Sequence, residues 1–147
     1  MIVMLSSRWE EEWRDEPYWE VRASKDFDDY PKGTLLFLAL VSGTGPDQMH
    51  RNRNEIVEKM HYSNFVEGVA GTVDGLGVDL DPDGTCVFTH DYVDVGEYEV
   101  VIQAEDVVRA LDWRIAIIES DDFHNPDADL PTCEIEVEVR PYSRNRD

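Results

Sequence analysis

The fold is decided by the stretch Ala104-Glu-Asp-Val-Val-Arg-Ala-Leu-Asp-Trp-Arg-Ile-Ala-Ile-Ile-Glu119, which carries the most regular apolar pattern in the chain. Its apolar side chains recur every three or four residues, at Ala104, Val107, Val108, Leu111, Ile115 and Ile118. On a helix with 3.6 residues per turn these positions form one continuous stripe, which a globular protein buries. We therefore expect a helix over Ala104–Glu119, with Leu111, Ile115 and Ile118 in the core.

Around this helix, three segments alternate apolar and polar residues, which is the pattern of a β-strand with one buried face. They are Trp19–Ala23, Tyr98–Ile102 and Ile135–Val139. The turn sequence Pro82-Asp83-Gly84 lies between Val78–Asp81 and Thr85–Thr89 and predicts a β-hairpin. Strands are therefore expected both before and after the helix.

The N-terminal segment has the signals of a short helix. Ser7 and Glu10 have the spacing of a capping box, in which the two side chains cap the first turn reciprocally. Trp9 and Trp13 are four residues apart and would share one helical face, and Pro17 would end the helix.

The segment from Asp28 to Gly77 contains a long apolar run and a second helical pattern. Thr34–Val41 is apolar almost throughout and follows a turn at Asp28–Gly33, so it predicts a strand buried on both faces. A helix is expected around Asp47–Tyr62, with an apolar side formed by Met49, Ile56, Val57 and Met60. Gly68, Gly71, Gly75 and Gly77 do not match a phosphate-binding fingerprint and instead predict turns and bends.

These elements predict an α+β fold, with a mostly antiparallel sheet packed with two or three helices. The chain has 147 residues, 41% of them hydrophobic, which fits one acidic globular domain over residues 1–147. No repeat or linker divides it. From Pro141 onwards the sequence predicts a flexible tail, which covers residues 141–147.

The charge of the chain is strongly and unevenly negative. Its 33 Asp and Glu against 13 Lys and Arg give a formal net charge of -20. Residues 60–108 contain eleven acids and no Lys or Arg, and residues 71–147 alone carry a net charge of -15. Self-repulsion on this scale lowers stability, so it calls for a basic partner, an advantage from the charge itself, or a salt-rich environment.

This composition also excludes several classes of partner. Nucleic acids and anionic membranes attract basic surfaces, and no basic cluster exists here. No segment reaches the length of a membrane helix, and Met1–Leu5 is too short for a signal peptide, so we expect a cytoplasmic protein. In a reducing cytosol, Cys86 and Cys133 are expected to be free thiols in the core.

The sequence contains no convincing metal, cofactor or catalytic motif. Asp79, Asp81 and Asp83 begin like a calcium loop, but His90 stands where such a loop needs a bidentate Glu. Glu58 and His61 give a single copy of a spacing that di-metal proteins use twice. Four scattered histidines have no nucleophile beside them, namely His50, His61, His90 and His124. We expect no cofactor, no metal, and a binding protein rather than an enzyme.

Three acidic segments are candidates for a partner-binding surface. Alternation places Glu134, Glu136 and Glu138 on one face of the last strand, and Glu97 and Glu99 form a similar row. Like charges opposite each other on neighbouring strands lower stability, and a basic partner would offset that cost. The third segment is the loop 120–131, where acids surround an aromatic residue as in many binding hot spots; its candidate residues are Asp121, Asp122, Phe123, Asp127 and Asp129.

The function expected from these observations is the neutralisation of a basic protein. The favoured setting is an immunity protein that blocks a nuclease-type toxin, whose cleft must be basic. The alternatives are a phage-type mimic of DNA that occupies a restriction or CRISPR enzyme, and an acidic domain from a halophile with no charge-specific partner. A halophile is considered because the chain has ten Arg but three Lys and is rich in Asp, and salt screens such charge.

Overall fold

The computed structural model describes residues 1–11, 18–24, 32–42, 45–60, 68–73, 76–81, 83–90 and 98–141. Within these ranges the chain forms three helices and eight strands. The strands are β1 (Ile2–Glu10), β2 (Tyr18–Ala23), β3 (Gly68–Val73), β4 (Leu76–Leu80), β5 (Thr85–His90), β6 (Tyr98–Gln103), β7 (Cys133–Glu136) and β8 (Glu138–Pro141). The helices are α1 (Lys32–Ser42), α2 (Pro46–Met60) and α3 (Ala104–Glu119).

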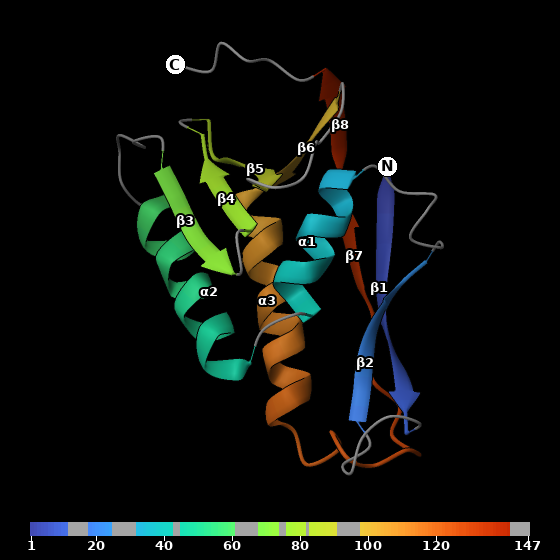
Figure 1. The fold of residues 1–147 in the computed structure, drawn as a ribbon. Coiled ribbons are helices and arrows are strands. Elements are labelled where there is room, and N and C mark those ends of the chain that lie inside the picture. The colour runs from blue at the N-terminus through green and yellow to red at the C-terminus, as the bar shows by residue number, and fades with distance from the viewer. Residues whose placement is uncertain are drawn as a thin grey trace.

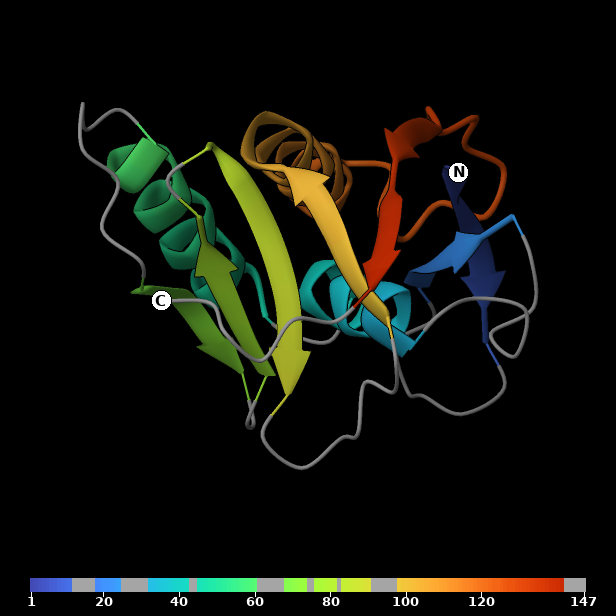
Figure 2. The same ribbon diagram turned by 90° about the horizontal axis from the view of Figure 1, so that it is seen from above.

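The strands form two antiparallel sheets, which confirms the α+β class (Figure 1). The smaller sheet has the order β2-β1-β7, and the larger has the order β3-β4-β5-β6-β8. The last two strands are separated by Val137 alone, yet each belongs to a different sheet. This crossing joins the two sheets along one continuous stretch of chain, as the view from above shows (Figure 2).

The helices fill the space beside these sheets. Helix α1 contacts β2, β5 and β6, and α3 contacts β5, β6 and β7, so both helices touch both sheets. Helix α2 packs on β3, β4 and α3. One core cluster contains buried apolar side chains from all three helices and both sheets. Among the described residues, no helix combines the length and apolar character needed to cross a membrane.

Several predicted elements are confirmed. Helix α3 has the expected bounds and buries Leu111 and Ile115, whereas Ile118 is only partly buried. Helix α2, β2, β6 and the β4–β5 hairpin lie where the sequence placed them. Gly84 supplies the positive φ of +85° that the hairpin turn requires.

The strand predicted over Thr34–Val41 is wrong, because these residues belong to α1. The segment contains four Leu and one Ala, which favour a helix, and few β-branched residues. A run that is buried on almost every side does not reveal its own period, so strand and helix look alike in sequence. The predicted turn at Asp28–Gly33 falls largely outside the described residues, and its last residue, Gly33, lies in α1. There α1 approaches β6 so closely that a Cβ on Gly33 would lie 2.7 Å from the Cβ of Val100.

The helix predicted from Ser7 is also wrong, because β1 is a strand that extends to Glu10. Val3 and Leu5 are buried, and β1 pairs with β2 on one edge and β7 on the other. Trp9 packs on Trp19 across the β1–β2 pair, with ring centroids 5.5 Å apart. Pairing of Ser7–Glu10 with β2 overrides the local capping signal. Trp13 and Pro17 lie outside the described residues.

The glycine-rich middle forms strands where turns and bends were expected. Gly68 and Gly71 lie in β3, and Gly77 lies in β4. The pairing of β3 with β4 shifts between Val69 and Gly71, and glycine commonly accompanies such an irregularity. The predicted tail after Pro141 lies outside the described residues, and Pro141 itself ends β8.

Candidate functional site

The crossing from β7 to β8 creates a fork between the two sheets. Val137 and Met1 exchange two backbone hydrogen bonds, of 3.0 Å and 2.8 Å, so they form a hydrogen-bonded pair at the end of the β1–β7 ladder. In an antiparallel ladder, hydrogen-bonded pairs alternate with pairs that are not hydrogen-bonded. Ile135, two residues before Val137, therefore also bonds to β1. The backbone N–H and C=O groups of Glu134 and Glu136 point to the opposite edge of β7. That edge faces α3, because Arg109 of α3 donates a 2.6 Å hydrogen bond to the carbonyl oxygen of Glu134.

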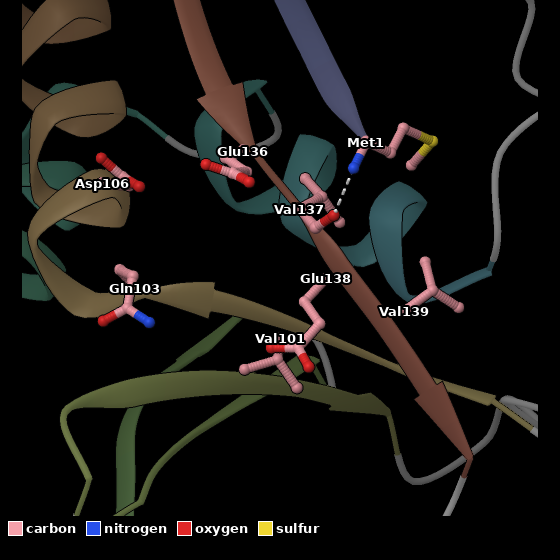
Figure 3. Close-up of a pocket in the computed structure, with 8 residues that line it drawn as sticks. All are labelled: Met1, Val101, Gln103, Asp106, Glu136, Val137, Glu138 and Val139. Carbon is pink, nitrogen blue, oxygen red and sulfur yellow. Dashed lines mark hydrogen bonds between the residues drawn. The ribbon is translucent and has the colours of Figure 1, made fainter.

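A pocket of about 450 Å³ lies in this fork (Figure 3). We call it the fork pocket. It is lined by Met1, by Val101 and Gln103 of β6, by Asp106 in the first turn of α3, and by Glu136, Val137, Glu138 and Val139 of the crossing strand. Three of these eight residues are acidic, and none is Lys or Arg.

The acidic groups of the pocket differ in how far they are neutralised. Asp106 forms a 3.1 Å ion pair with Arg109, which lies one helical turn further along α3. The carboxylates of Glu136 and Glu138 are exposed, and neither forms a hydrogen bond or close ion pair with the described residues, although the charge of Glu138 acts on nearby Arg140. These two groups are therefore available to a cation from another molecule.

Exposed apolar side chains surround the same pocket. Three large hydrophobic residues are exposed in the described part of the chain, namely Met1 at 41%, Ile2 at 54% and Val139 at 39%. Met1 and Val139 line the fork pocket, and Ile2 lies opposite Glu136 on the neighbouring strand. Exposed apolar groups that gather around a polar centre are typical of a protein interaction site.

A partly buried ion network holds β8 beside the pocket. Arg140 donates from Nε to Glu99 of β6 at 2.8 Å and from a terminal nitrogen to Asp81 at 3.4 Å. Burial lowers the pKa of Arg140, but the hydrogen bond and charge of Glu99, together with Asp81 and Glu138, outweigh this effect and raise the pKa above its ordinary value. A base with a raised pKa loses its contribution only as the pH rises through that pKa, so Arg140 stays charged at neutral pH.

The expected surface row of Glu97 and Glu99 is corrected by this network. The Glu99 side chain is 3% exposed and paired with Arg140, so it cannot present its carboxylate to a partner. Both faces of β6 are buried, since Val100 and Val101 are buried as well. Glu97 lies outside the described residues.

The single final strand predicted over Ile135–Val139 is two strands, β7 and β8, which the alternation of apolar and acidic residues did not predict. Glu134, Glu136 and Glu138 are all exposed, and Ile135 and Val137 are buried, as expected. However, Glu134 and Glu136 belong to one sheet and Glu138 to the other. Glu136 and Glu138 nevertheless line the same pocket, whereas Glu134 does not.

The acidic loop after α3 lies at the opposite end of the smaller sheet from the β7–β8 crossing (Figure 1). Its four aspartates are exposed, namely Asp121, Asp122, Asp127 and Asp129. Phe123 is only partly exposed, because the guanidinium of Arg114 lies 5.6 Å from its ring centroid. Trp19 also ties the loop to β2 through a 2.9 Å hydrogen bond to the carbonyl oxygen of Asn125. The aromatic residue expected to contact a partner thus packs largely within the molecule.

The calcium-like sequence forms the hairpin turn. Asp83 accepts hydrogen bonds from the backbone and hydroxyl of Thr85, and Asp81 pairs with Arg140. Of Asp79, only the backbone in β4 is described. The described residues contain no group of three or more His, Cys, Asp or Glu side chains that could hold a metal ion.

The two cysteines give a direct test of the core. Both are free and buried, and burial raises the pKa of each thiol, that of Cys86 to about 12. Since the thiolate is the reactive form, Cys86 should not react with a disulfide dye at about pH 8 while the protein is folded. The Cys133→Ala variant isolates this thiol, and unfolding in urea provides the positive control. Rapid labelling of the folded variant would contradict the burial of Cys86.

Sequence reasoning found Glu136 and Glu138 but missed Gln103, Asp106 and the apolar rim. The strand–helix junction at Gln103–Ala104 was visible, but its proximity to the crossing strand depends on long-range pairing. The chain matches no protein-family model, curated protein or solved structure.

Proposed function

We propose that this protein binds and neutralises a basic protein partner, and that the fork pocket forms the centre of the binding surface. The observation that carries the proposal is the combination of exposed Glu136 and Glu138 carboxylates with the three exposed hydrophobic side chains around them. Acidic groups give speed and specificity to the recognition of a basic partner, and apolar groups give the contact its affinity.

An immunity protein against a nuclease-type toxin is the biological setting we favour. A nuclease needs a basic cleft to hold its substrate, and an acidic protein can occupy that cleft. The net charge of -20 supports long-range attraction between two such proteins. The core of this chain is built from ordinary helices and sheets, and apart from buried Glu99 the acidic side chains that the structure describes are exposed or partly exposed.

The proposal predicts fast association that slows as salt rises, because salt screens long-range attraction. The basic partner would be captured from the native host, and its association would be followed by stopped-flow fluorescence. Replacing Glu134, Glu136 and Glu138 with Lys should slow association by about tenfold or more at low salt. The matched control replaces Asp121, Asp127 and Asp129 with Lys, which changes the net charge equally at a distance from the fork.

The results of these experiments distinguish whether the protein binds a basic partner from where on its surface the partner binds. Absence of any basic partner, or association that is independent of salt, would refute the proposed function. A larger effect from the loop variant would move the binding surface to the loop, and equal effects would indicate a diffuse field. Capture of a restriction or CRISPR enzyme would assign the protein to the DNA mimics instead of the immunity proteins.

A further inference from the structure

We infer that the fork pocket is a receptor for the guanidinium group of an arginine side chain on the partner. The inference rests on the proposed function and makes it more specific, since it names the chemical group that anchors the complex. It draws on an arginine of this chain that already occupies the neighbouring position on the same strand edge.

That internal arginine is Arg109. Its guanidinium bridges the carbonyl oxygen of Glu134 at 2.6 Å and the carboxylate of Asp106 at 3.1 Å. The β7 edge therefore binds a guanidinium by combining a strand carbonyl with a side-chain carboxylate from α3. Arginine donates in a planar fork, which suits such convergent acceptors.

The same arrangement recurs two residues further along the strand. The backbone groups of Glu136 point to the same edge as those of Glu134, and the two positions are roughly 7 Å apart on an extended strand. Here Asp106 again faces the strand, and the carboxylates of Glu136 and Glu138 add further acceptors (Figure 3). None of the residues that line this second position is Lys or Arg, and the positive charge in the lining, the α-ammonium of Met1, is engaged with the carbonyl oxygen of Val137 at 3.0 Å.

The surroundings favour arginine over lysine. Asp106 offers a carboxylate acceptor from α3, and Glu136 and Glu138 offer carboxylates from the crossing strand, so five N–H donors in one plane can meet several acceptors together. An ammonium group is a compact, strongly hydrated charge that gains less from such a spread of acceptors. Met1 and Val139 provide apolar surface for the methylene groups of the arginine side chain. Arginine is also enriched among the residues that dominate binding energy at protein interfaces.

The test uses the whole protein labelled with ¹⁵N and two small probes. N-acetyl-arginine amide and N-acetyl-lysine amide each carry one positive side chain and no charged terminus. In a titration followed by amide chemical shifts, the arginine probe should shift Gln103, Asp106 and Glu136–Glu138 in a saturable manner. Its affinity should be several-fold higher than that of the lysine probe.

Two variants of equal charge locate the effect. Glu136→Gln with Glu138→Gln should weaken binding of the arginine probe roughly tenfold, because hydrogen bonds to two charged groups are lost. Asp121→Asn with Asp127→Asn should leave it unchanged. All four side chains are exposed, so both variants are expected to fold, and thermal melting verifies this.

Shifts spread over every acidic surface, equal binding of both probes, or equal loss in both variants would overturn the arginine receptor. If the arginine probe fails while a captured basic protein still depends on Glu136 and Glu138, the proposed function stands without this anchor. If the probe binds the fork selectively but no basic protein is captured, the receptor stands and the neutralising function falls.

Discussion

Replacing Leu111 with Ala should lower the free energy of unfolding by about 2–5 kcal/mol. Leu111 is fully buried in the core cluster, and α3 contacts strands of both sheets as well as the two other helices. The truncation removes buried apolar surface and leaves a cavity that such a framework fills only in part. Equilibrium unfolding in urea measures the loss, and an unchanged slope with denaturant would show that the unfolding transition is otherwise the same.

The control for this prediction is Ile2→Ala. Ile2 is apolar and of similar size but 54% exposed, so its truncation should cost less than about 1 kcal/mol. Equal losses in the two variants, or no loss for Leu111→Ala, would contradict the placement of α3 at the centre of the core.

The elements predicted correctly from sequence are those with a clear hydrophobic period or with a residue that marks a turn. Helix α3 carries its buried apolar stripe along about four turns. Gly84 marks the hairpin turn because glycine readily adopts the positive φ that the turn requires. Helix α2 was found for the same reason, through the spacing of Met49 and Ile56. In these segments local preference and tertiary burial agree.

The errors arise where long-range contacts decide the structure. Thr34–Val41 is apolar on nearly all sides because α1 contacts both sheets, so its sequence carries no clear period. The capping signal at Ser7 is overridden because Ser7–Glu10 pairs with β2, while the first half of β1 pairs with β7 near the other end of the chain. Such pairings are invisible in a local window of sequence.

The candidate site was predicted only in part for a related reason. Alternation identified Glu136 and Glu138 as exposed, but it could not show that the strand changes sheets at Val137. That crossing brings Asp106 and Met1 to the same pocket. Alternation also misassigned Glu99, because a strand buried on both faces can carry a charged residue when a partner such as Arg140 neutralises it.

The Glu99–Arg140 pair leads to the second large expected effect, a loss of about 3–5 kcal/mol on replacing Arg140 with Met. Removal of the guanidinium takes the 2.8 Å ion pair away from the 3%-exposed carboxylate of Glu99, and breaking a buried ion pair by removing one partner is costly. It also removes the link to Asp81 across the larger sheet. Thermal and urea unfolding of the variant would measure the loss.

Two further variants make the Arg140 result specific. Arg53→Met breaks an ion pair with Asp112 that is well exposed, so it should cost only about 0–1 kcal/mol. The double variant Glu99→Leu with Arg140→Met removes both charges together and should recover much of the loss, because replacing a whole buried ion pair by apolar groups costs less than removing one partner of it. A loss for Arg140→Met as small as that for Arg53→Met would show that Glu99 finds compensation elsewhere. It would also show that the edge strand beside the fork pocket is held mainly by its backbone pairing with β6.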